Sequence, residues 1–433
     1  MALFKRLVTL TTGTAGGQLI LLLSTPILAR LYSPQDFGYF ATSTGLAMIF
    51  SAVAYFRYDA ALLIHDKKSD PAALLHLSIF LLLFTGLLFY IALYISQNSK
   101  FYASIVPGEL GILKMVLLFL MLSLSGLLTT WHARYNRFSV ISSSKIILAS
   151  AVAGFQYIGY SKYGGIGLIL GNISGLVLVN IFLIYFVISN DSKVVMIKPN
   201  LSNIKKGMIV HKSFPIYSVF STLLNGLSNQ LPSMLFARAF GASYAGYYSM
   251  SSRFTRGPVS LIGQSVSHVV SAHVGINATD IDEIRKTIVT ILSKMTHFAG
   301  PLLIMSIFFV EKFFSFVLGE GWETAGILAM IFLPWIYALY LSWPVTCVFN
   351  TLGRQNLVLV FNFLFIVAIA LPFIFVNWIG QQGVVYLMMF LGSLFRFAYI
   401  VSALRLIEAS VRRNLIPSIV YWAISVITVL LIS

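Results

Sequence analysis

The chain has 433 residues, of which 58% are hydrophobic and only 10% charged, and its formal net charge is +16. A soluble domain of this composition lacks the charged and polar side chains needed to cover its surface, which excludes a water-soluble globular protein. The excess of Lys and Arg is explained by cytoplasmic loops of a membrane protein, so no nucleic-acid partner is expected. The single cysteine, Cys347, excludes an intramolecular disulfide.

Apolar segments long enough to cross a bilayer, about 20 residues each, follow one another along the chain. The first runs through Leu28, too far for the apolar region of a signal peptide, so we interpret it as an uncleaved span. A thirteenth apolar segment, after Arg405, Arg412 and Arg413, either spans the membrane or lies along its surface. The sequence predicts spanning helices at residues 7–30, 38–64, 72–96, 111–133, 142–160, 164–188, 212–237, 243–273, 285–310, 325–350, 357–379 and 383–405.

A polar, basic connection separates the sixth predicted span from the seventh and divides the chain into halves. With the N-terminus inside, about three times as many Lys and Arg fall on the cytoplasmic side as outside, which predicts a cytoplasmic N-terminus. The fold class expected is an all-α integral membrane protein with two parallel six-helix bundles around a central cavity. We predict an N-terminal lobe over residues 1–190, a cytoplasmic connection over 191–211, a C-terminal lobe over 212–410 and a hydrophobic segment over 411–433.

A short motif recurs at equivalent places in the two halves. An Ala-Arg pair is followed by a Gly-Tyr pair at Arg30 and Gly38, and again at Arg238 and Gly246, with an offset of 208 residues. An even number of spans separates the copies, so the halves would have the same orientation, as in transporters with parallel repeats. We interpret Arg30 and Arg238 as anchors in the headgroup region.

Four arginines fall inside predicted spans: Arg57, Arg253, Arg256 and Arg396. An arginine at the bilayer centre costs at least about 2.5–3.5 kcal/mol, so these side chains must face protein or water. Asp59 is the one acidic residue clearly inside a predicted span, and in a continuous helix it does not share a face with Arg57, so pairing would need a neighbouring helix. The excess positive charge favours an anionic substrate such as a phosphate, which arginine binds bidentately. Alternatively, the arginines cap carbonyls or pair with Asp59 and loop carboxylates.

Other polar residues in the spans have structural explanations. Gln18, Asn229 and Gln230 could contact sugar hydroxyls, although hydrogen bonding between helices is the more usual role of such amides. Gly167, Gly171 and Gly175 form a small-residue ridge suited to helix packing. No P-loop, HExxH or GxSxG motif occurs, so no catalytic residue, metal site or cofactor is predicted.

The opening residues, Thr12-Gly13 to Gln18 and then PILARLYSPQDFG from Pro26 to Gly38, resemble the start of Wzx-type bacterial polysaccharide flippases, as does the run YYSMSSRF from Tyr247. The resemblance implies a multi-pass protein of the bacterial inner membrane that moves undecaprenyl-pyrophosphate-linked oligosaccharides, such as O-antigen units, to the outer leaflet. It also implies a cationic cavity, which Arg57, Arg253, Arg256 and Arg396 would line, with Asp59 in the sugar path or in coupling. Membrane lipids and other polysaccharide-assembly proteins would be its partners.

Two other functions stay open at this point. A cation-coupled multidrug extruder of the same superfamily would be expected to use membrane carboxylates, of which only Asp59 is available. A membrane glycan polymerase or ligase usually needs acidic residues or a large exterior loop, and neither is evident.

Overall fold

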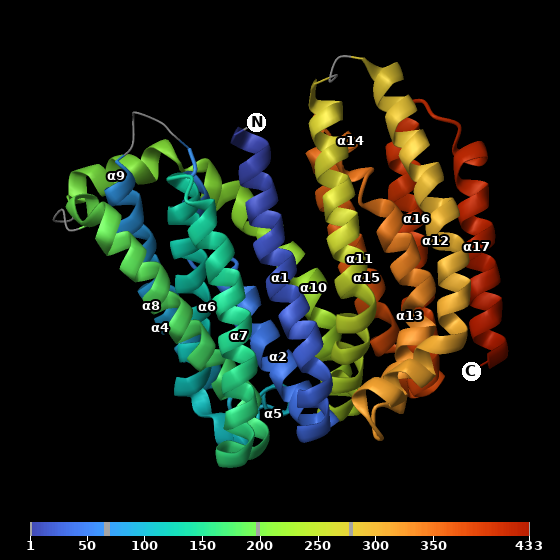
Figure 1. Cartoon of the computed structure of the whole chain (residues 1–433), viewed down its shortest axis with the longest axis horizontal. Coiled ribbons are helices and arrows are strands. Elements are labelled where there is room, and N and C mark those ends of the chain that lie inside the picture. Colours follow the sequence, from blue (N-terminus) through green and yellow to red (C-terminus); the bar gives the residue numbers. More distant parts are fainter. Residues whose placement is uncertain (1, 65–69, 196–199, 277–279, 433) are drawn as a thin grey trace. The chain divides into compact units, whose positions relative to one another are not determined.

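The computed structural model describes residues 2–64, 70–195, 200–276 and 280–432, and within them every regular element is a helix (Figure 1). Nine segments of the described chain are long and apolar enough to cross a membrane, which confirms the predicted all-helical membrane fold. The helices are α1 (Ala2–Leu31), α2 (Pro34–Ser51), α3 (Tyr58–Ala61), α4 (Pro71–Ser96), α5 (Lys100–Ile105), η1 (Gly108–Leu110), α6 (Gly111–Arg134), α7 (Phe138–Tyr163), η2 (Gly164–Ile166), α8 (Gly167–Val195), α9 (Leu201–Val210), η3 (Phe214–Ser218), α10 (Val219–Phe240), α11 (Ala242–Ile276), α12 (Ile281–Leu318), α13 (Glu323–Ser342), α14 (Thr346–Thr351), α15 (Gln355–Ile374), α16 (Val376–Leu406) and α17 (Val411–Ile432).

The chain forms two compact units, Met1–Gly246 and Tyr247–Ser433, each with its own hydrophobic core. The boundary falls inside α11, so α10 packs within the first unit although it follows the long connection. A Cβ at Gly45 of α2 would lie 3.1 Å from the side-chain oxygen of Gln230 in α10, which shows how closely these helices approach. The predicted lobe limits at residues 190 and 212 stay a prediction.

Glycines allow α1, α7 and α8 to pack closely in the first unit. A Cβ at Gly171 would lie 2.6 Å from the backbone nitrogen of Gln156, and one at Gly175 would lie 2.9 Å from that of Val152. Real Cβ atoms essentially never come this close, so the side chains must be absent. The predicted packing role of the glycine ridge in α8 is therefore confirmed.

The thirteenth apolar segment forms α17, which packs beside α12 in the second unit (Figure 1). The Thr296 and Ser418 hydroxyls are hydrogen-bonded at 2.7 Å, and the Tyr421 ring lies against Gly300 one turn farther along both helices. The contacts advance in the same direction, so the two helices run parallel. α17 thus packs along a candidate spanning helix and is itself long and apolar enough to span, and that it spans stays a prediction.

One expectation about the first half is corrected, and one helix is longer than expected. The predicted span at 38–64 is not one helix, because α2 ends at Ser51 and the chain turns before α3 begins at Tyr58. The connection between the halves is partly helical: α8 continues to Val195, past its predicted end, and α9 occupies residues 201–210.

Candidate functional site

The break between α2 and α3 is the first candidate feature. Phe56 and Arg57 have φ angles of 46° and 64°, in the left-handed region that costs non-glycine residues roughly 1–2 kcal/mol each. The Thr85 hydroxyl donates to the Ala54 carbonyl at 3.0 Å, which satisfies a backbone group in the interrupted stretch. Strained backbone of this kind persists only where surrounding contacts fix it, and it is often found at functional sites.

The break brings Arg57 and Asp59 together. The Arg57 Nη1 lies 3.5 Å from the Asp59 Oδ2, and both side chains are largely buried. The expectation that pairing would need a neighbouring helix was wrong, because it assumed a continuous helix through these residues. Arg57 Nε and Asp59 Oδ1 are buried without a hydrogen-bond partner among the described residues, so the pair has unused donor and acceptor capacity.

Two tyrosines of the broken segment, one before Arg57 and one between Arg57 and Asp59, hold it against other helices. The Tyr55 hydroxyl donates to the Ser123 carbonyl of α6, and the Tyr58 hydroxyl donates to the Met208 carbonyl of α9 at 3.4 Å. Arg134, at the end of α6, donates to the carbonyls of Leu62 and Ile64 and so caps the end of the segment. The segment that carries the ion pair is thus held by hydrogen bonds to α6 and α9.

The three predicted amides have different environments. Gln18 is exposed on α1, beside Gly17, which packs on the backbone of Lys145 in α7. Asn229 donates to the Asn225 carbonyl of its own helix at 2.8 Å. Gln230 lies between α10 and α2, with its amide nitrogen 3.6 Å from the Met48 sulfur. A role in the sugar path stays a prediction for all three residues.

The second unit contains the other arginines. Arg253 and Arg256 lie one turn apart near the middle of α11, where they share a face. Arg256 lines a narrow pocket between α11 and α13 together with hydroxyl and aromatic side chains. The buried Ser251 Oγ and Trp335 Nε1 in this lining have no hydrogen-bond partner among the described residues. The pocket therefore offers one cation and unused hydrogen-bonding groups.

Arg396 of α16 lies over an aromatic ring. Its guanidinium carbon is 4.5 Å from the centre of the Phe365 ring, a cation–π geometry, and its Nε has no hydrogen-bond partner among the described residues. The Phe365 ring in turn contacts Trp335, with ring centres 6.0 Å apart. Trp335 also lines the pocket that Arg256 lines, so the Phe365–Trp335 ring pair connects the surroundings of the two arginines. The structure thus places Arg256 and Arg396, far apart in the sequence, near the same aromatic pair, and we call these two arginines the cationic cluster.

Carboxylates in the described part of the second unit lie toward the helix ends. They belong to loops or to the first or last two turns of helices, whereas Arg256 and Arg396 lie farther from the ends of α11 and α16. The described carboxylates of this unit therefore lie nearer the helix ends than Arg256 and Arg396 do. The acidic residues are Asp280, Asp282, Glu283, Glu311, Glu320, Glu323 and Glu408.

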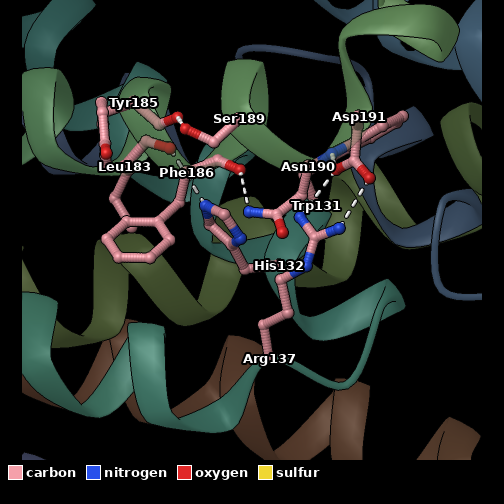
Figure 2. Close-up of polar contacts among 9 residues, drawn as sticks. All are labelled: Trp131, His132, Arg137, Leu183, Tyr185, Phe186, Ser189, Asn190 and Asp191. Atoms are coloured by element: carbon pink, nitrogen blue, oxygen red, sulfur yellow. Dashed lines mark hydrogen bonds and ion pairs between the residues drawn. The ribbon is translucent and has the colours of Figure 1, made fainter.

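A second buried ion pair escaped the sequence analysis (Figure 2). Arg137 donates through both terminal nitrogens to the Asp191 carboxylate, at 2.7 and 2.6 Å, and the Trp131 indole donates to the same carboxylate at 2.9 Å. These hydrogen bonds raise the pKa of the Arg137 guanidinium. The neighbouring His132 ring nitrogen Nε2 is 3.1 Å from the Leu183 carbonyl.

The sequence had placed Arg137 and Asp191 in separate cytoplasmic connections. Asp191 instead lies near the end of α8, at a kink where its backbone leaves helical geometry. The apolar run before Asp191 gives only a weak signal that the helix continues. Lys145 was counted with the cytoplasmic cations although the predicted span at 142–160 includes it; it is the eighth residue of α7 and adds a cation within a candidate span. Within the described chain, no group of three or more His, Cys, Asp or Glu residues could hold a metal ion.

Comparison with known proteins decides the family. A family model described as "Polysaccharide biosynthesis protein" matches residues 27–326, more than half of the chain. The chain belongs to this family. A Klebsiella pneumoniae protein described as an uncharacterized membrane protein in the cps region is 23% identical over 195 residues. That match covers 43% of this chain and 38% of the relative, so the chain aligns with well under half of that protein's length.

Solved structures show which fold the family member has. The lipid II flippase MurJ in an inward closed conformation gives a TM-score of 0.73 at 13% identity, covering 97% of this chain and 92% of that one. An inward-facing MATE multidrug transporter of the MOP superfamily gives 0.61 at 14% identity, covering 94% and 96%. A MOP superfamily transporter from Pyrococcus furiosus gives 0.57 at 14% identity, covering 93% and 94%. The polysaccharide biosynthesis protein therefore has the two-lobed, all-helical fold of these transporters.

Proposed function

We propose that this protein is a flippase that moves an undecaprenyl-pyrophosphate-linked oligosaccharide from the inner to the outer leaflet of the bacterial inner membrane. The observation that carries the proposal is the cluster of Arg256 and Arg396, because Arg256 lines a pocket with Trp335 and Arg396 lies over Phe365, whose ring contacts Trp335. Family membership supports an oligosaccharide, and the transporter fold supports movement across the membrane.

The cluster suits a diphosphate in both charge and geometry. Each guanidinium has a planar fork of N–H donors that fits two phosphate oxygens, and such charge-assisted bonds are stronger than neutral ones. The Phe365 face holds Arg396 by cation–π attraction while leaving the edge of the guanidinium available. An anion bound between the two arginines would relieve their mutual repulsion, so binding would be coupled to a local change in electrostatics.

Alternating access requires the substrate to be released as well as held. In the first unit, Arg57 already pairs with Asp59, so a phosphate reaching Arg57 would compete with an internal carboxylate. Competition of this kind keeps binding weak and reversible. We therefore assign Arg57 and Asp59 to a transient contact or coupling step, and Arg253, Arg256 and Arg396 to holding the headgroup.

A leaflet-transfer assay tests the proposal. The protein is reconstituted into vesicles containing a fluorescent polyprenyl-diphosphate oligosaccharide, and the initial rate of transfer is measured by reduction of the accessible dye. Removing one charged hydrogen bond typically costs about 1.5–3 kcal/mol, so Arg256→Gln and Arg396→Gln should each slow transfer roughly tenfold or more. Arg354→Gln is a matched control, because Arg354 is an exposed arginine at a helix start, outside the cluster. Full activity in the correctly folded double variant would refute the site.

The alternatives predict different products in the same preparation. A multidrug extruder of the MATE type would export cationic dyes, which the Arg256–Arg396 cluster should repel. A glycan polymerase or ligase would lengthen or transfer the oligosaccharide chain, which mass spectrometry of the recovered lipid would reveal. Transfer of an unchanged lipid-linked oligosaccharide, without dye export, separates flipping from both.

A further inference from the structure

An open groove runs along one side of α16 in the second unit. It has a volume of about 1120 Å³ and is bounded by Phe361 of α15 and by residues of α16 from Leu394 to Leu406. Its lining is apolar except for Ser402 and Arg405, and the Arg405 side chain is exposed. In a membrane protein such a groove is a place for hydrocarbon, with one cation at its end.

The groove has the length of one membrane leaflet. From Leu394 to Arg405, at 1.5 Å per helical residue, it extends about 16 Å. The hydrocarbon core of a bilayer is about 30 Å thick, so half of it matches this length. A phospholipid acyl chain fits this length, whereas an undecaprenyl chain of 55 carbons is far longer.

The end of the groove at Arg405 is positively charged. Arg405 is in the last turn of α16, and the exposed Arg412 and Arg413 are in the first turn of α17. Glu408, between them, is within 3.5 Å of Arg285, which also donates to the Ile407 carbonyl at 2.7 Å. Because Arg285 occupies the one carboxylate of this connection, the groove end keeps its positive charge. Basic helix ends of this kind face the cytoplasm.

The groove is separate from the proposed substrate cluster. Arg405 follows Arg396 by nine residues, which at 100° per residue places the two on opposite sides of α16. Arg396 lies over Phe365, whereas the groove is lined by Phe361, one turn earlier on α15. A phosphate held by Arg405 is therefore not positioned to reach Arg396.

We propose that this groove is a binding site for an anionic phospholipid of the cytoplasmic leaflet. One acyl chain lies along Phe361, Phe397 and Val401, and the phosphate accepts hydrogen bonds from Arg405. The two-part chemistry explains the lining: the hydrocarbon excludes water from the apolar side chains, and the arginine selects for negative charge. The inference does not depend on the proposed transport function.

Lipid titration of the purified full-length protein tests the site. Phosphatidylglycerol or phosphatidylcholine with identical acyl chains is added in detergent, and bound lipid is measured by native mass spectrometry. One basic residue near a membrane surface contributes about 1 kcal/mol toward anionic lipid, so phosphatidylglycerol should bind about fivefold more tightly. Arg405→Gln should remove this preference, Arg405→Lys should keep most of it, and Ala398→Trp should block both lipids by filling the groove.

Arg238→Gln is the matched control, because Arg238 is also an exposed arginine in the last turn of a helix. This variant should prefer phosphatidylglycerol as strongly as the unmodified protein does. Equal binding of both lipids to the unmodified protein would overturn the proposal, as would a preference that survives Arg405→Gln. Displacement of phosphatidylglycerol by one equivalent of undecaprenyl diphosphate would assign the groove to the carrier lipid instead. Because the readout is lipid binding, failure here leaves the transport proposal untouched.

Discussion

Gly38 and Gly246 each pack against the first turn of the helix that carries the other. A Cβ on Gly38 would collide with the Ala242 carbonyl at the start of α11, and a Cβ on Gly246 would collide with the Pro34 carbonyl at the start of α2. The same offset of 208 residues separates the two glycines and the two carbonyl residues. The repeated motif in the sequence is therefore a reciprocal contact in the first unit, made by corresponding residues of the two halves.

We expect Gly38→Ala and Gly246→Ala to destabilise the protein, because either methyl group forces the two helix starts apart. Overpacking of this kind costs about 1–3 kcal/mol, which should lower the midpoint of thermal unfolding in detergent. The double variant should cost less than the sum of the two, because the first substitution already separates the helices. Gly126→Ala is the control, because Gly126 is helical with open space around it. The unfolding midpoint of this variant should equal or exceed that of the unmodified protein. Unchanged midpoints in all three variants would contradict the close contact.

Breaking the Arg137–Asp191 pair should be severely destabilising. Arg137→Ala leaves a buried carboxylate with the Trp131 indole as its remaining neutral donor, and losing one partner of a buried pair costs on the order of 3–5 kcal/mol. Trp131→Phe should cost less, about 1.5–3 kcal/mol, because it removes one hydrogen bond to the carboxylate and leaves the ion pair in place. A double-mutant cycle with Asp191→Asn, followed by thermal unfolding, measures the coupling. Additive effects would show that the pair does not act as a unit.

The left-handed backbone at Arg57 predicts that a glycine at this position gives a more stable protein than an alanine, the reverse of the usual order within a helix. Arg57→Gly and Arg57→Ala both remove the ion pair with Asp59, but only glycine tolerates a φ of 64° freely. The glycine variant should therefore be more stable than the alanine variant by about 1–2 kcal/mol. At Thr44, inside α2, the order should be normal, with alanine more stable than glycine. The midpoints of thermal unfolding of the four variants test this prediction. If alanine were more stable than glycine at both positions, the helix break at Arg57 would be absent.

The parallel packing of α17 on α12 predicts the side of the C-terminus. Because α16 ends at the basic end of its unit and α17 runs away from it, the Ile432 end of α17 should lie outside the cytoplasm. Alkaline phosphatase fused after Ser433 should be active, whereas a fusion after Ser410, with α17 removed, should be inactive. Activity in the opposite pattern would place α17 along the cytoplasmic surface.

Gly300 provides a separate check on how α17 is held. A Cβ at this position would lie 2.5 Å from the Tyr421 ring, so Gly300→Ala should push α17 from α12. We expect a lower unfolding midpoint, and Tyr421→Ala should rescue the Gly300→Ala variant by removing the ring. A lower midpoint in Gly300→Ala that Tyr421→Ala does not restore would show that the glycine is needed for a reason other than contact with the Tyr421 ring.

The sequence by itself determined the membrane location, the helical class, the repeat and the candidate arginines. These features are local: hydropathy over about 20 residues decides whether a segment spans, and an arginine in an apolar run stands out whatever it contacts. Even the reciprocal glycines were visible as a spacing, although their contact was not.

Only the tertiary structure decided the partners. Arg57 meets Asp59 because the backbone turns left-handed at Phe56 and Arg57, where no glycine or proline signals a break. Arg137 and Asp191, and likewise Arg396 and Phe365, come from different helices, and nothing in the sequence marks the faces that meet. The physical reason is the lipid solvent: spanning helices are apolar on every side, so they lack the polar and apolar stripes that reveal packing faces in soluble proteins.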